Sequence, residues 1–155
     1  MAEKEDRKKG DDKQGDDDLN DLLQENRILL QGAQVLTAFL TILPFSQGFE
    51  KVNDTEKWLY LATFMCSLTS LVLFTAPAAM HRLARPLQDR QHYKDIATRL
   101  IVVGLVPASL ALAFSSQIVT SAVVGEPVSW IVAGVVAAII GALWWVIPLT
   151  MKEDI

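Results

Sequence analysis

Four long stretches without a charged residue constrain this chain more than any other feature. Residues 28–49, 58–80, 100–124 and 128–151 contain no Asp, Glu, Lys or Arg, although 21% of the chain is charged. Each stretch exceeds the roughly 20 residues that a helix needs to cross about 30 Å of hydrocarbon. A surface helix of a soluble bundle would carry charges on its outer face every few residues. We therefore predict an all-α membrane protein with four transmembrane helices.

The connections between these stretches predict how the helices pair. Only residues 125–127 separate the third and fourth spans, so these two helices should be antiparallel neighbours. Pro44 and the polar residues that follow it indicate a short connection between the first two spans. Pro77 is the expected end of the second span, ahead of a basic hinge at residues 81–99. The predicted architecture is therefore two antiparallel hairpins joined by this hinge.

The distribution of positive charge predicts the orientation. Of the 14 Lys and Arg residues, twelve lie in the N-terminal segment up to Arg27, in the hinge or at the C-terminus, and only Lys51 and Lys57 lie in the other connections. Because cytoplasmic loops carry the excess of Lys and Arg, both termini and the hinge should be cytoplasmic. We expect a location in the inner (cytoplasmic) membrane. The hinge would also attract anionic lipid headgroups, as other cytoplasmic loops of this composition do.

The first 18 residues differ from the rest in having almost no apolar side chain. Met1 and Ala2 are the exceptions. Such a segment cannot bury enough surface to offset the entropy of ordering, so we predict a disordered, charged cytoplasmic tail at 1–18 ahead of a transmembrane domain at 19–155. A solvated tail and a partner-binding tail are both compatible with this composition.

Polar residues in the first span recur every three or four positions and share one face of the expected helix. Carboxamides in a membrane helix need hydrogen-bond partners, so this face is predicted to point into the bundle, towards hydroxyls of the second span. This face would either hold packed helices together by hydrogen bonds or line a path for water or a polar solute. This candidate intramembrane polar face comprises Gln31, Gln34, Thr41, Ser67 and Ser70.

Small residues in the last two spans also recur at helical spacing. The third span has Gly104, Ala108 and Ala111 in one stripe, and the fourth has Gly134 and Gly141 in another. Small side chains let helix backbones approach closely. These stripes could serve packing within one subunit or between subunits, so a homo-oligomer is compatible with the sequence.

The residue types argue against an enzyme or a metal protein. His81 and His92 are the only histidines, and the single Cys66 is expected deep in the second span, remote from both. A metal site would need several clustered ligands. Ionisable residues at membrane depth usually mark an intramembrane active site, and the four spans contain none. We expect a non-enzymatic protein without a cofactor and without a nucleic-acid partner.

Two stretches carry recognisable motifs. The first has Gly32 and Gln34 early in span one and Pro44-Phe45 at its end. The second is Ala76-Pro77 followed by His81-Arg82, with an arginine, Arg99, opening span three. Together they resemble a family of small bacterial four-span membrane proteins of unknown function, over roughly residues 22–150. Some members carry a sodium:proton antiporter label, but such exchange needs a carboxylate near the midplane, and no span of this chain holds one.

The sequence thus favours a structural or partner-binding membrane bundle. The alternative is a small transporter or channel for a cation, a proton or a small polar solute, which would use the polar faces of spans one and two. At the cytoplasmic edge we expect a polar cluster in which Glu25 pairs with an arginine and holds the hairpins together. The members of this cluster are Glu25, Arg27, His81, Arg82 and Arg99.

Overall fold

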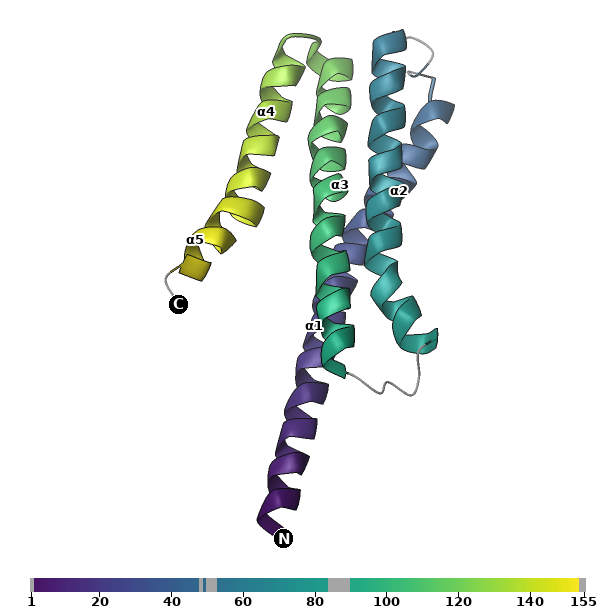
Figure 1. Cartoon of the computed structure of the whole chain (residues 1–155). Helices are drawn as coiled ribbons and strands as arrows, with labels where there is room; N and C mark the ends of the chain where they lie inside the picture. Colours follow the sequence, from purple (N-terminus) through teal and green to yellow (C-terminus); the bar gives the residue numbers. More distant parts are fainter. Residues whose placement is uncertain (1, 48, 50–52, 84–89, 154–155) are drawn as a thin grey trace.

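The computed structural model is helical throughout the part of the chain that it describes (Figure 1). It describes the backbone of residues 2–47, 49, 53–83 and 90–153, and the side chains of residues 20–47, 49, 53–83 and 91–151. The predicted all-helical class is therefore confirmed. In chain order the elements are α1 (Ala2–Ile42), the 3-10 turn η1 (Leu43–Phe45), α2 (Asp54–Leu83), α3 (Arg90–Val124), α4 (Val128–Ile140), the π-helical segment η3 (Gly141–Val146) and α5 (Ile147–Glu153).

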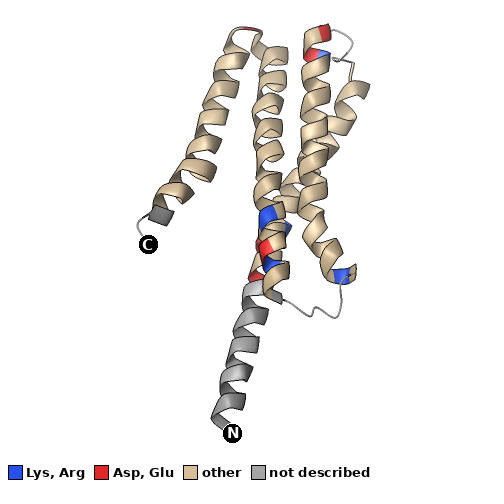
Figure 2. Cartoon of the chain, in the orientation of Figure 1, with Lys and Arg blue, Asp and Glu red and all other residues tan. Residues whose placement is uncertain are grey.

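Four helical segments are long and apolar enough to cross a membrane. They are Asn20–Phe45, Asp54–Leu83, Gln91–Val124 and Val128–Met151. Figure 2 shows the charged residues of the described part gathered towards the ends of the helices, with long uncharged stretches between them. Burying charge in hydrocarbon is unfavourable, so this separation is what a membrane-spanning helix requires. The four helices indicate a multi-pass membrane protein.

The helices form an open arrangement rather than a closed four-helix bundle. Each helix packs on the next one in the chain, and the contact between α2 and α3 is the most extensive. Helix α1 crosses behind these two and also contacts α3 (Figure 1). Among the described residues, α4 contacts α3 but neither α1 nor α2, and its lower part diverges from the other helices. The unit that holds the fold together is therefore α1, α2 and α3, with α4 attached to one side.

The predicted hinge at residues 81–99 is largely helical. Helix α2 continues through Pro77 to Leu83, and α3 already begins at Arg90. Proline lacks the N–H that would bond back along the helix, so it bends α2 without ending it. Helix α2 therefore extends past Pro77, where the sequence indicates that the second span ends. Residues 84–89, which include the predicted hinge residue Arg85, lie outside the described part.

The charged N-terminal segment is helical, whereas its composition predicts disorder. Helix α1 begins at Ala2 and runs without interruption into the first span. Glu3 and Arg7 are four residues apart, as are Glu5 and Lys9. Opposite charges at this spacing favour a helix, more so when the acidic residue comes first. Continuity with a stable span also avoids the cost of nucleating a separate helix.

One of the two small-residue stripes mediates contact within the chain. A Cβ added at Gly104 would lie 2.8 Å from Cε1 of Phe74, so glycine is required for α2 and α3 to approach this closely. Further along α3, Ala108 and Ala111 are buried as well. By contrast, Gly134 of α4 and Gly141 of η3 have no atom within 4 Å of an added Cβ.

Helix α4 changes its geometry before its end. In η3 the backbone N–H of Ile147 donates to the carbonyl of Ala142, five residues earlier, as in a π-helix. The next residue is Pro148, which cannot donate to the carbonyl of Trp144. At the other end of α4, Gly125 has a φ of +83°, which L side chains rarely adopt, and this conformation permits the tight connection from α3.

Candidate functional site

The structure does not join the predicted cytoplasmic cluster by ion pairs. Glu25, Arg27, Arg82 and Arg99 are exposed. Among the described side chains the ion pair within 4 Å is that of Lys57 with Asp54, at 3.2 Å, far from this cluster at the opposite helix ends. The expected pairing of Glu25 with an arginine is therefore absent here. His81 is half-buried, with its ring centroid 5.7 Å from that of Tyr93.

Asn26, which lies between Glu25 and Arg27, joins α1 to α2 by a hydrogen bond. Its side chain is only 3% exposed, and its Nδ2 donates to the backbone carbonyl of Phe74 at 2.7 Å. This bond joins α1 to α2 in the turn that contains Pro77. Pro77 has no N–H to bond to the carbonyl of Leu73, so this turn lacks one bond of the helix.

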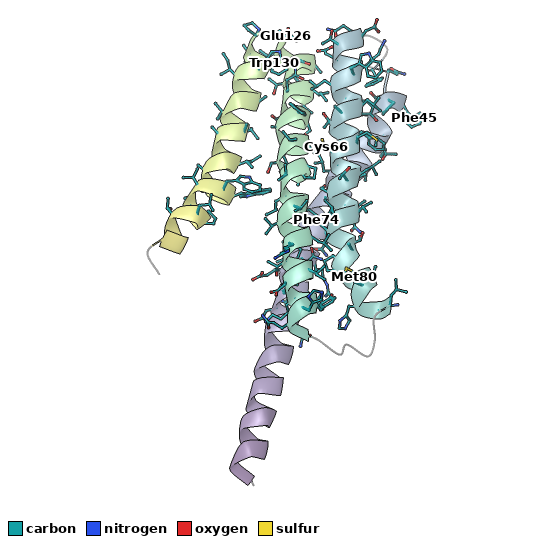
Figure 3. All side chains as sticks on the ribbon, viewed as in Figure 1. Phe45, Cys66, Phe74, Met80, Glu126 and Trp130 are labelled. Carbon is teal, nitrogen blue, oxygen red and sulfur yellow. The ribbon has the colours of Figure 1, made fainter. Side chains whose placement is uncertain are left out.

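A second side chain reaches the same turn from α3. The hydroxyl of Tyr93 donates to the carbonyl of Pro77 at 2.6 Å, and Tyr93 is 4% exposed. It packs against Ala97, with Leu22, Leu23 and Met80 around them. We call Asn26, Phe74, Pro77 and Tyr93 the proline clamp, because side chains of α1 and α3 both bind the bent backbone of α2. Figure 3 marks Phe74 and Met80 along this part of α2.

Removing the hydroxyl of Tyr93 should weaken the proline clamp. We expect Tyr93→Phe to lower the free energy of unfolding by about 0.5–1.5 kcal/mol, because the buried carbonyl of Pro77 loses its donor. Tyr60→Phe is a matched comparison, since the Tyr60 hydroxyl also donates to a backbone carbonyl, that of Leu40, but in a half-buried position. Thermal unfolding in detergent would measure both. An equal or smaller loss for Tyr93→Phe would contradict the role of the clamp.

The predicted intramembrane polar face is split between the inside and the outside of the fold. Ser67 and Ser70 of α2 are buried, together with Thr63. Gln31 and Gln34 of α1 are exposed, as is Thr41, so the prediction that their face points inward is wrong. The residues of α1 that face its neighbours are Asn26, Ala33, Thr37 and Leu40.

Thr37 is the residue of α1 that meets the buried hydroxyls. Its Oγ1 lies 2.7 Å from the Oγ of Ser67, a hydrogen bond that joins α1 and α2 in the interior. Thr37 also bonds the carbonyl of Ala33 in its own helix, and Ser70 bonds the carbonyl of Ser67. The buried hydroxyls are therefore satisfied by one another and by the backbone.

A second buried amide lies towards the other end of the fold, and the sequence reasoning missed it. Gln117 of α3 is fully buried, and neither its Oε1 nor its Nε2 has a hydrogen-bond partner among the described residues. One turn further on, Ser121 donates to Glu56 of α2 at 2.8 Å. A glutamine in the middle of an apolar run is the signal that would have identified Gln117.

A mostly apolar cavity of about 240 Å³ lies beside the proline clamp. It is bordered by Gly32 of α1, Phe74 of α2, Ala108 of α3 and Trp144 of η3. It occupies the space left where α4 diverges from α1. Among the described residues, its only hydroxyl is that of Ser70. The described residues contain no group of three or more His, Cys, Asp and Glu side chains that could hold a metal ion.

The chain matches one known protein family over most of its length. A family model described as a family of unknown function (DUF6328) matches residues 8–148. The chain belongs to this family. The matched region of DUF6328 includes the proline clamp and nearly all of the four apolar helices. No match was found among curated proteins or among solved structures.

Membership of DUF6328 agrees with the resemblance that the sequence motifs suggest, a four-span family of unknown function. Three residues of those motifs have clear positions in the structure. Pro77 lies in the proline clamp, and His81 stands one turn further along α2, against Tyr93. Gln34 lies on the exposed face of α1.

Proposed function

We propose that this protein is a non-enzymatic multi-pass protein of the inner membrane that acts through helix association, as a structural or partner-binding element. Two features support this. Between α1 and α2, the buried hydroxyls of Thr37 and Ser67 bond to each other, and those of Thr63 and Ser70 bond to backbone carbonyls. The glutamines of α1, in turn, lie on the outside, where another membrane segment can reach them.

The hydrogen bond between Thr37 and Ser67 is the observation that carries this proposal. A path for ions or polar solutes along α1 and α2 would have to pass these two hydroxyls, which lie 2.7 Å apart and are both buried. The cavity nearby has a mostly apolar lining and contains one hydroxyl, that of Ser70. Such surroundings favour helix packing over conduction.

The orientation proposed for the protein has both termini on the cytoplasmic side. Its support is the distribution of the Lys and Arg residues, together with the position of the two chain ends towards the same end of the fold (Figure 1). Arg82 and Arg99 are exposed at that end, where α2 ends and α3 begins. We include anionic lipid headgroups among their partners.

Flux measurements test the proposed function. The full chain in proteoliposomes should pass Na⁺, K⁺ and H⁺ no faster than protein-free liposomes do under an imposed gradient. Ser67→Ala should lower the free energy of unfolding by about 0.5–1.5 kcal/mol, because Thr37 loses its partner. A gradient-driven flux that Ser67→Ala or Gln34→Leu abolishes, with unchanged stability, would instead support the transporter or channel.

A further inference from the structure

The exposed face of α1 carries a regular series of residues that faces no other helix of the chain. Its members follow at alternating spacings of three and four, and all of them are exposed. This is the spacing of the contact positions in a left-handed pair of helices. We call this series the polar seam. It consists of Gln24, Arg27, Gln31, Gln34, Ala38 and Thr41.

The two glutamines in the middle of the polar seam need a partner. Gln34 lies about 10 Å beyond Arg27 along the helix axis, well inside the apolar span. An amide left without hydrogen bonds in hydrocarbon is strongly unfavourable. No hydrogen bond to Gln31 or Gln34 is present among the described residues, whereas Thr41 donates to the carbonyl of Thr37 in its own helix. The glutamines thus require a polar group from outside this chain.

A second copy of the same chain supplies that group. A carboxamide is both donor and acceptor, so two identical glutamines related by a two-fold axis can bond to each other. Copies with the same membrane topology have parallel α1 helices, which is the arrangement that the spacing of the seam fits. Ala38 leaves room for close approach of the backbones. Arg27 lies at one end of the seam, where its long side chain can extend to the headgroups.

We propose that the polar seam is the interface of a parallel homodimer, held by hydrogen bonds between Gln31, Gln34 and their counterparts. The proposal rests on the proposed function, because it identifies the partner that the bundle binds. The other open face, around Gly134 of α4, has no polar group at depth that requires a partner.

Disulfide cross-linking in native membranes tests the dimer. The native thiol is first removed by Cys66→Ala, and single cysteines are then introduced by Ala38→Cys or Thr41→Cys, which keep both glutamines. The matched control is Phe39→Cys, which is next to Ala38 at the same depth and 70% exposed but outside the seam. With a mild oxidant, both seam positions should form a species of twice the chain mass at least fivefold more efficiently than position 39.

A second measurement tests the glutamines themselves. Energy transfer between two differently labelled full-length copies in liposomes should fall at least fivefold in the double variant Gln31→Leu, Gln34→Leu. Thermal stability at high dilution in detergent should stay unchanged, because both side chains are exposed. A fall in stability together with energy transfer would mean that the glutamines support the fold of one chain, which would overturn the proposal.

The outcomes separate this proposal from the proposed function. Cross-linking of the seam positions to a different protein would overturn the homodimer but leave a partner-binding role intact. Equal cross-linking at positions 38 and 39, or none at either, would overturn the homodimer. Solute flux through liposomes would contradict the proposed function whatever the cross-linking shows.

Discussion

Replacing Gly104 with leucine should strongly destabilise the contact between α2 and α3. A Cβ at this position would lie 2.8 Å from Cε1 of Phe74 and 3.1 Å from Cβ of Leu73, so the two helices would have to move apart. Phe74 is 1% exposed, so its ring can yield only by shifting towards the apolar cavity that it borders. Overpacking of this kind costs about 1–3 kcal/mol and occasionally more. Thermal unfolding in detergent, followed by circular dichroism, would measure the loss.

Gly134→Leu is the matched control for this effect. An added Cβ at Gly134 has no atom within 4 Å, so the same substitution should change stability by no more than about 0.5 kcal/mol. Combining Gly104→Ala with Phe74→Leu should cost less than the sum of the two single changes, because the smaller side chain makes room for the added methyl group. Additive losses, or an equal loss for Gly104→Leu and Gly134→Leu, would contradict the close contact.

Asn26→Asp should destabilise the protein by about 3 kcal/mol or more, although the side chain hardly changes in size. Asparagine donates from Nδ2 to the carbonyl of Phe74, and an ionised aspartate has no donor to offer. The change also places a negative charge beside a carbonyl oxygen at a position that is 3% exposed. A buried, unpaired charge costs more than a lost neutral hydrogen bond. Thermal stability and the abundance of the protein in membranes are the measurements.

Glu25→Gln provides the control at the neighbouring position. Glu25 is exposed and forms no ion pair within 4 Å with the described arginines, so its neutralisation should change stability by no more than about 0.5 kcal/mol. A loss for Glu25→Gln as large as that for Asn26→Asp would support an ion pair of Glu25 with Arg27, Arg82 or Arg99. It would also show that the proline clamp contributes less than its geometry indicates.

The candidate site could be predicted from the sequence only in part. The sequence singled out the ends of the first three spans near Glu25, His81 and Arg99 as a candidate cluster, because polar and charged residues gather there. It did not single out the residues that make the contacts, since Glu25 and Arg27 are exposed while Asn26 and Tyr93 bind the backbone of α2. Asn26 and Tyr93 donate to backbone carbonyls. Because every residue has a backbone carbonyl, the pattern of side chains does not predict which one is the acceptor.

The orientation of α1 shows the same limit. Gln31 and Gln34 were expected inside because they are polar, and they lie outside. In water, apolar periodicity identifies the buried face of a helix. In a bilayer the surroundings are as apolar as the interior, so the contrast between two faces does not say which one packs against a neighbour. Packing decided it: α1 presents Ala33, which packs with Phe74 and Ala108, and Thr37, which bonds Ser67.

The sequence by itself therefore determined that the chain has four segments apolar and long enough to span a membrane, because the cost of burying charge depends on the local run of residues. The tertiary structure alone decided which face of each helix is inside, that α2 continues past Pro77, and that α4, among the described helices, packs on α3 and not on α1 or α2. These features depend on how the surfaces of helices that are distant in the sequence fit together. The bilayer is as apolar as the interior, so it does not favour one face of a helix over another.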